Sequence, residues 1–267
     1  MLVIECLIVA LIAAFVVWQV ASCAGSGGKA EPAPGGSKYG MANYTDYDWD
    51  NLSKDSNGRL AYTADGERRS KTGIDVSEHQ NEVDWRRVAA DDVQFAIIRL
   101  GARGTTEGTV KLDERYAENL TGARDAGLSV GVYFFSQATS EDEAREEARF
   151  VLDTLDGTRL DYPVVYDLEE TGTGAARADN MTTEQETACA KAFCETIAAA
   201  GYTPMIYGNS NDISHYSMDD LHDYPLWFAS YNDLPYGPVG FNIWQYTDTG
   251  TVDGIETPAD LSIQIKP

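Results

Sequence analysis

From Gly73 to the C-terminus, short apolar runs rich in β-branched and aromatic residues alternate with stretches of helical character. Short apolar strands separated by helices are typical of a parallel sheet that is covered on both faces. About eight such runs within about 195 residues favour a compact (β/α) barrel. The predicted strands cover 72–76, 94–100, 128–135, 162–168, 204–207, 226–230, 241–246 and 261–265.

Helical patterns fill the gaps between the first strands and then become scarce. The predicted helices cover 84–91, 113–126, 140–155 and 183–200. Two of them begin with a capping-box pattern, Ser140 with Glu143 and Thr183 with Glu186, and the last one stops at Gly201. Because the second half is poorer in helices, we expect an irregular α/β barrel of the TIM type that is helix-poor in that half.

Residues 1–23 form an apolar leader with the length of a signal-peptide core or a marginal membrane anchor. The run from Val20 to Cys23 resembles a bacterial lipobox, in which Cys23 would carry the lipid. A lipoprotein signal and an uncleaved anchor are both open at this point. Either one predicts a protein outside the cytoplasm, attached to the bacterial membrane and facing the wall, with a secreted form as an alternative.

Residues 24–72 link the leader to the first strand and change in character along their length. The first part is a Gly/Pro/Ser/Ala stretch typical of a flexible tether, whereas 39–72 is rich in aromatic residues. Two turn signals, Asn57-Gly58 and Asp65-Gly66, flank a short strand predicted over 59–64. This aromatic stem either packs on the domain that follows it or binds a wall polymer, and packing is the favoured alternative.

The domain after the stem is strongly acidic. The chain has 43 Asp and Glu residues against 20 Lys and Arg, a formal net charge of −23, and residues 73–267 hold 35 of the acids and 13 of the bases. This balance argues against a nucleic-acid partner, since binding to phosphates depends on cations. The three histidines lack zinc-ligand spacing, so we expect no metal and no cofactor. Cys189 and Cys194 are expected to be buried free thiols.

Polar and aromatic side chains stand at the carboxyl ends of the predicted strands, and Asp260 lies near the last of them. In barrels of this type the active site lies at that end of the sheet. The residues predicted to line it are Asp75, Arg99, Tyr133, Phe135, Asp167, Glu169, Tyr207, Asn209, Tyr231, Gln245 and Asp260. Because burial of an unpaired carboxylate is costly, four acids at such positions indicate a functional site.

The pair Asp167 and Glu169 carries the most information. The alternation of side chains along a strand places both on one face, with Leu168 on the other. Two carboxylates this close repel each other, which favours a proton on one of them near neutral pH. A general acid beside a charged carboxylate is what glycosidic bond cleavage requires. The alternative is a structural role, in which the two acids cap a helix or pair with Arg177.

Several aromatic side chains near these acids could present flat faces and hydroxyl groups to sugar rings. We favour Tyr133, Tyr207 and Gln245 as substrate-binding residues. Trp227 and Trp244 lie within predicted strands, where a role in the core is the simpler explanation.

An ordered set of motifs resembles glycoside hydrolase family 25, the Chalaropsis-type lysozymes. The opening Gly73-Ile74-Asp75-Val76-Ser77 is followed by matches at 131–135, 167–169, 205–209, 226–231 and 243–255. Together they span about residues 73–265, and the segment NGRLAYTADGE of the stem resembles what precedes this domain in membrane-attached bacterial members. The resemblance therefore makes 73–267 the catalytic domain.

The resemblance implies an irregular (β/α) barrel that cleaves the β-1,4 bond between N-acetylmuramic acid and N-acetylglucosamine in peptidoglycan. By position, Glu169 matches the proton donor of the family and Asp167 its partner acid. Asp75 and Asp260 match the two further acids of the cleft, although Asp253 competes with Asp260 for that place. Asp167 would either orient the substrate's N-acetyl group for internal attack or position a water molecule.

Two other functions remain open on the sequence. The domain could be a wall-binding module without activity, or a different, chitinase-like glycosidase. The chitinase-type D-x-x-D-x-D-x-E run is absent, because Leu160-Asp161-Tyr162-Pro163 precedes the strand instead. The expected partners are peptidoglycan strands and, through the N-terminal segment, a membrane, and we expect a monomer.

Overall fold

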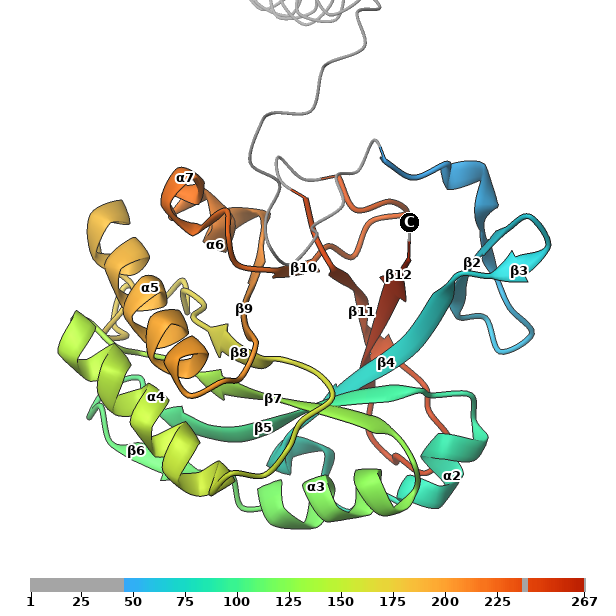
Figure 1. Ribbon diagram of the computed structural model, residues 1–267, viewed down its shortest axis with the longest axis horizontal. Coiled ribbons are helices and arrows are strands. Elements are labelled where there is room, and N and C mark those ends of the chain that lie inside the picture. The colour runs from blue at the N-terminus through green and yellow to red at the C-terminus, as the bar shows by residue number, and fades with distance from the viewer. Residues whose placement is uncertain (1–45, 237–239, 267) are drawn as a thin grey trace, which may run out of the picture. The chain divides into compact units, whose positions relative to one another are not determined.

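The computed structural model describes residues 46–236 and 240–266, so the leader, Cys23 and the tether lie outside the described residues. Eight strands close into a barrel, and the short β6 (Val110–Leu112) pairs with the end of one of them (Figure 1). This arrangement confirms the predicted barrel. The barrel strands are β4 (Ser70–Val76), β5 (Phe95–Arg103), β7 (Ser129–Phe135), β8 (Val164–Asp167), β9 (Pro204–Asn209), β10 (Leu226–Ala229), β11 (Ile243–Gly250) and β12 (Ala259–Ile265).

The direction of the last strand departs from a regular barrel. Neighbouring strands from β4 through β5, β7, β8, β9 and β10 to β11 pair in parallel, but β12 pairs antiparallel with both β11 and β4. Because β12 runs backwards, its first residues lie at the mouth where the other strands end. Asp260, the second residue of β12, is therefore the direct register partner of Asp75 near the end of β4.

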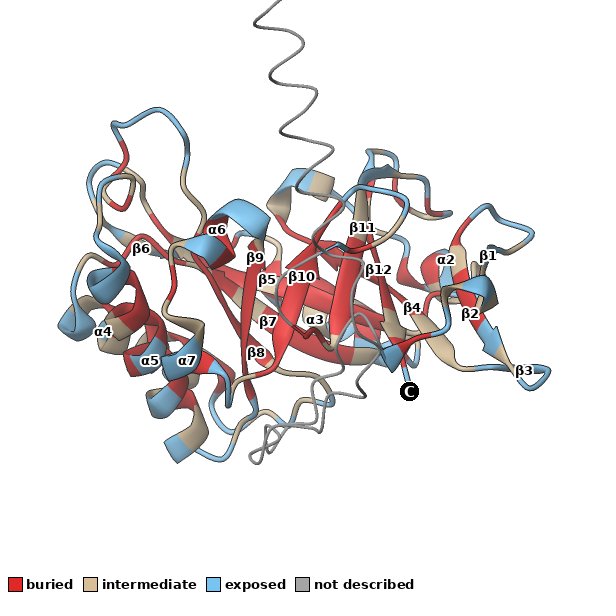
Figure 2. Cartoon of the chain, turned by 90° about the horizontal axis from the view of Figure 1, so that it is seen from above, coloured by how far each residue is buried: buried red, intermediate tan, exposed pale blue. Residues whose placement is uncertain are grey.

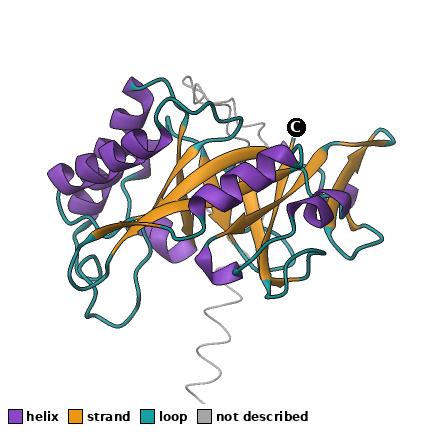
Figure 3. Ribbon diagram, turned by 90° about the horizontal axis from the view of Figure 1, so that it is seen from below, coloured by secondary structure: helices purple, strands orange, loops and turns teal. Residues whose placement is uncertain are grey.

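Helices line the outside of the first part of the barrel and thin out afterwards, as the sequence predicts. The long ones are α4 (Glu141–Leu155) and α5 (Thr183–Ala199), which pack against each other, while the shorter α2 (Trp85–Ala90) and α3 (Tyr116–Asp125) form a second pair further round the barrel. Only the short α6 (Ser210–Ser214) and α7 (Met218–Leu221) follow β9 among the described residues. Figure 3 shows the strands crossing the centre with the helices along the outside, and Figure 2 shows that burial concentrates in the strands.

The starts of the two long helices differ from the predicted caps. Helix α5 is capped by Thr182, whose side chain accepts from the backbone of Gln185 in a complete capping box, so the predicted pair Thr183 and Glu186 was wrong by one residue. At α4, Ser140 accepts from the backbone of Glu143 as expected, but the Glu143 carboxylate accepts from Thr139 instead of closing the box. Side chains of similar type stand at adjacent positions in both segments, and the sequence pattern does not separate them.

The interior of the barrel is a small apolar core of its own. Phe95 lies at one end of it, stacked on Tyr162 with ring centroids 4.5 Å apart. A Cβ atom at Gly73 would lie 2.1 Å from the Phe95 ring, so this position requires glycine. Trp227 belongs to the same core. It is buried and donates from Nε1 to Ser262 Oγ at 3.0 Å, which agrees with the core role predicted for it from the sequence.

The described part of the stem, from residue 46 onward, packs on the barrel. A small antiparallel sheet of β1 (Leu52–Lys54), β2 (Leu60–Ala64) and β3 (Glu67–Arg68) contains the strand predicted over 59–64. Tyr47 is buried and stacks on Phe241 at 5.8 Å, and Trp49 meets the edge of the buried Trp244. Of the two alternatives for the stem aromatics, packing is therefore the one that these two residues adopt.

Two further observations concern the described residues. Cys189 and Cys194 are free and buried on α5, as expected. No helix in the described part of the chain is both long and apolar enough to cross a membrane.

Candidate active site

Four carboxylates meet at the mouth of the barrel. Asp75 and Asp260 face each other across neighbouring strands, and their side chains are hydrogen-bonded. Asp167 is the last residue of β8, and its carboxyl is hydrogen-bonded to that of Glu169, two residues further on. Since β8 is three strands away from β4 around the barrel, the two acid pairs approach the mouth from different sides.

An amide holds one of these pairs in place. Gln245 on β11 is buried and donates from Nε2 to Asp75 Oδ2 at 2.9 Å. Its Oε1 accepts from the hydroxyls of Tyr207 at 2.8 Å and Tyr231 at 3.0 Å. Because both tyrosines donate to the oxygen, the nitrogen of the amide must point at Asp75. The network fixes the position of the Asp75 carboxylate.

Burial and mutual repulsion raise the proton affinity of the acids. Burial, followed by the charges of Asp212 and Asp260, raises the pKa of Glu169 to about 7. Burial and the charge of Glu169 raise the pKa of Asp167 well above its usual range. Burial and the charge of Asp260 do the same for the pKa of Asp75. The raised pKa of Glu169 lets this carboxyl hold a proton near neutral pH, which is the condition for a proton donor.

A pocket of about 400 Å³ opens beside Glu169. Tyr207 and Asn209 from β9 line it together with the loop that follows β10. Tyr231 in that loop is 52% exposed although its hydroxyl is bound to Gln245. The pocket thus offers a protonatable acid and an exposed aromatic face within one cavity.

The structure brings most of the predicted site residues to this mouth, but the burial and the contacts of these residues differ from one to the next. Tyr133 is half-buried with its ring 6.4 Å from that of Trp227, and burial raises the pKa of its hydroxyl, with the charge of Asp75 adding to the effect. Phe135 is the register partner of Asp167. Asn209 lines the pocket, but its side-chain oxygen also caps α6.

Arg99 is engaged in ion pairs at the edge of the mouth. Its Nε lies 2.7 Å from Asp113 Oδ2, and a terminal nitrogen lies 2.9 Å from Glu78 Oε1. Its positive charge lowers the pKa of Asp167, against the larger effect of burial. Arg99 therefore acts on the site through its charge, while its Nε and one of its terminal nitrogens are engaged by two other acids.

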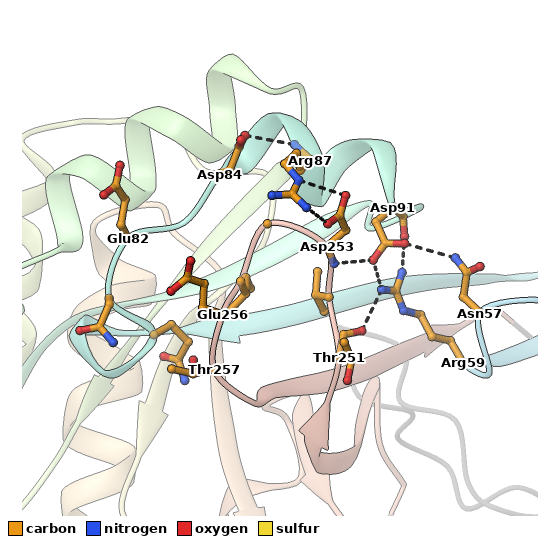
Figure 4. Close-up of a pocket in the computed structure, with 15 residues that line it drawn as sticks. Asn57, Arg59, Glu82, Asp84, Arg87, Asp91, Thr251, Asp253, Glu256 and Thr257 are labelled. Atoms are coloured by element: carbon orange, nitrogen blue, oxygen red, sulfur yellow. Dashed lines mark hydrogen bonds and ion pairs between the residues drawn. The ribbon is translucent and has the colours of Figure 1, made fainter.

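Neither Arg177 nor Asp253, the two residues that the sequence offered as alternatives, takes part in the four-acid group. Arg177 pairs with Glu143 at 2.6 Å and donates to the Gln137 carbonyl at 3.1 Å, so its guanidinium is engaged by groups other than Asp167 and Glu169. Asp253 pairs with Arg87 in a separate pocket of about 960 Å³ between α2, the β11–β12 loop and the stem (Figure 4). Asp260, rather than Asp253, lies opposite Asp75.

Sequence reasoning missed Asp212. This acid is buried on α6, accepts from the Asn209 backbone at 3.0 Å, and raises the pKa of Glu169 through its charge. The sequence pattern that could have revealed Asp212 is Asn209-Ser210-Asn211-Asp212, which forms a capping box at the end of a barrel strand.

One cluster in the described residues has the composition of a metal site. Glu170, Glu186 and His215 each offer a ligand atom within 4.8 Å of the others, with His215 Nδ1 3.3 Å from Glu170 Oε1. The cluster lies next to Glu169 in sequence but is not part of the four-acid group.

A closed (β/α) barrel with paired carboxylates at its mouth, one of them with a pKa near 7, defines the class of protein as a barrel glycoside hydrolase. The sequence model for glycosyl hydrolases family 25 matches residues 74–255. The chain belongs to this family, as the motif resemblance implied.

Individual relatives agree with this assignment. The chain is 32% identical over 203 residues to the uncharacterized protein YegX of Escherichia coli K12, covering 72% of this chain and 68% of YegX. It is 28% identical over 193 residues to the autolytic lysozyme of Clostridium acetobutylicum, covering 71% of this chain and 54% of that protein. Its fold is similar to that of the modular autolysin LytC from Streptococcus pneumoniae, solved with a synthetic peptidoglycan ligand, with a TM-score of 0.67 at 24% identity over 80% of this chain and 52% of LytC. The chain thus spans about half the length of the latter two proteins.

Proposed function

We propose that the protein is a peptidoglycan hydrolase that cleaves the β-1,4 bond between N-acetylmuramic acid and N-acetylglucosamine. The observation that carries the proposal is Glu169, a mouth carboxyl whose pKa of about 7 lets it hold a proton at neutral pH. Membership of glycosyl hydrolases family 25 and similarity to an autolytic lysozyme support the substrate class.

In the proposed reaction Glu169 gives its proton to the glycosidic oxygen as the bond to C1 of N-acetylmuramic acid breaks. The departing N-acetylglucosamine keeps that proton in its 4-hydroxyl group, while C1 gains oxocarbenium character. A water molecule then adds its oxygen to C1 and returns a proton to Glu169. The products are two shorter strands, one of which has a new reducing end on N-acetylmuramic acid.

The other acids act on the positive charge that develops at C1. Asp167, hydrogen-bonded to Glu169, either orients the N-acetyl group of the substrate for internal attack or positions the water molecule. Asp75 and Asp260 share a hydrogen bond and lie across the mouth, where negative charge stabilises an oxocarbenium-like transition state. Gln245 holds Asp75 in that place.

The direct test of the proton donor is Glu169→Gln in the 267-residue chain, assayed by clearing of purified peptidoglycan. We expect a loss of about 10²–10⁴-fold in kcat, the usual contribution of general acid catalysis. Glu195→Gln, an exposed substitution on α5, is the matched control and should keep full activity. Near-normal activity of Glu169→Gln would overturn the assignment.

The same assay separates the two other functions. Binding of the wild-type chain to peptidoglycan without release of fragments would favour the inactive wall-binding module. Faster cleavage of chitin than of peptidoglycan would favour the chitinase-like alternative.

We also propose that residues 1–23 attach the enzyme to the outer face of the bacterial membrane, either through a lipid on Cys23 or as an uncleaved anchor. Mass spectrometry of the membrane fraction distinguishes the two, because an intact Met1 terminus excludes the lipoprotein form. Recovery of all the protein from the cytoplasm would contradict both.

A further inference from the structure

The pocket beside Glu169 continues into a second pocket that the stem helps to build. This second pocket has a volume of about 430 Å³ and lies between β11, the loop after β10, and the hairpin that joins β1 to β2. Tyr231 and Asn232 line both pockets, so the two cavities meet at these residues. From the stem, Lys54, Asn57 and Leu60 line the far side. The cavity at the catalytic acid thus extends to a segment outside the family match at 74–255.

The hairpin of the stem is held firmly enough to form a wall. Asp55 Oδ1 accepts from the backbone of Asn57 at 2.9 Å and of Arg59 at 3.0 Å, which closes the turn. The buried Arg59 side chain bonds to Asp91 after α2 and to the Thr251 carbonyl at 3.2 Å, as Figure 4 shows. These bonds connect the turn to two separate parts of the barrel.

The lining of this combined groove suits a sugar chain. The exposed ring of Tyr231 stands where the two pockets meet, and its hydroxyl is fixed on Gln245, so the ring offers a flat face in a defined place. Beyond it, Asn57, Thr247 and Thr249 supply amide and hydroxyl groups. Flat apolar faces flanked by such groups match the alternating faces and hydroxyls of a glycan.

The end of the groove that is formed by the stem hairpin carries a positive charge that can bind an acidic ligand group. Two cations line the second pocket, and one of them, Arg59, is paired with Asp91. Lys54 is exposed and has no ion-pair partner among the described residues. One acid, Asp233, also lines this pocket, where it follows Asn232 in the loop after β10. In a chain with a net charge of −23, a cation in this position selects for a carboxylate on the ligand.

We propose that the glycan strand runs from Glu169 over Tyr231 into the groove under the stem hairpin, where Lys54 binds a carboxylate carried by a muramic acid unit or its peptide. This inference rests on the proposed function, because it takes the occupant of the groove to be the same strand that Glu169 cleaves. It makes the stem a part of the substrate-binding surface as well as a spacer.

The test compares Lys54→Glu with the control Lys191→Glu, an exposed lysine on α5, both in the 267-residue chain. The ratio of kcat/KM on long peptidoglycan strands to that on the shortest fragment cleaved should fall about fivefold for Lys54→Glu, as loss and reversal of one exposed charge contact predicts. The change should appear in KM for the long strands. An unchanged ratio, or an equal fall in the control, would overturn the proposal.

A second measurement keeps this result separate from the proposed activity. In the Glu169→Gln background, binding to long peptidoglycan strands and to chitin oligosaccharides of equal length is compared with and without Lys54→Glu. Weaker binding of the peptidoglycan strands alone supports the carboxylate contact, and equal binding in all cases refutes it. If the wild-type chain releases no fragments, the proposed function fails, while the binding comparison still tests the groove.

Discussion

Replacing Glu169 with Gln should stabilise the fold at the same time as it removes activity, because the wild-type carboxyl is held where its charged form is disfavoured. Burial and neighbouring acids raise its pKa from 4.5 to about 7. A carboxyl with a higher pKa in the folded state binds its proton more tightly there. Its contribution to stability is therefore complete below about pH 4.5 and is lost as the pH rises through about 7. A neutral amide does not undergo this loss.

The size of the effect follows from the two pKa values. Since one pKa unit corresponds to about 1.4 kcal/mol, the gain in the free energy of unfolding should be about 3 kcal/mol near pH 8 and under about 1 kcal/mol near pH 5. For a domain of this size, each kcal/mol raises Tm by roughly 2–4 °C. The variant should therefore unfold roughly 6–12 °C above the wild type at the higher pH.

The assay is unfolding by heat or urea of the 267-residue chain at both pH values, with Glu195→Gln as the exposed control. The control should match the wild type throughout. Equal stability of Glu169→Gln and the wild type near pH 8 would refute the assignment of a raised pKa to this residue. A gain of the same size at both pH values would show that its origin is packing and not charge.

Three further predictions concern the same mouth and the core below it. The kcat/KM for peptidoglycan should fall about tenfold per pH unit above about pH 7 as Glu169 loses its proton, and a flat profile to about pH 9 would contradict its role as the donor. Gln245→Leu removes the amide that holds Asp75, so kcat/KM should fall about 10–100-fold, as expected for one hydrogen bond to a charged group, and an unchanged value would disprove that positioning role. Gly73→Ala should destabilise the fold by about 2–3 kcal/mol through its clash with Phe95, and adding Phe95→Leu should restore part of the loss; an unchanged Tm in the single variant would disagree.

Most strands of the barrel were predictable because they are buried on both sides and therefore form apolar runs. The direction of β12 was not predictable in this way. A strand of seven residues has the same alternation whether it runs up or down, and only its short connection from β11 hints at a reversal. Asp260 was nevertheless placed at the mouth, because it lies near the last predicted strand and matches a cleft acid of the family. The antiparallel strand does bring its first residues to that end.

The candidate site was predictable where one strand carries the information and less so where distant segments contribute. The alternation in Asp167-Leu168-Glu169 is local, and the two carboxyls do meet. The partners of Arg99, by contrast, come from Glu78 and Asp113, which reach it through two separate loops. Contacts between segments this far apart along the chain cannot be predicted from the spacing of residues in the sequence.

In the proposed function, Glu169 protonates the glycosidic oxygen, and the cleavage leaves a new reducing end on N-acetylmuramic acid. The most direct measurement is digestion of purified peptidoglycan, reduction of the new ends with borohydride, and identification of the reduced sugar by mass spectrometry. We predict reduced muramic acid from the wild-type chain and almost none from Glu169→Gln. Reduced glucosamine as the new end, or no new end at all, would contradict the claim.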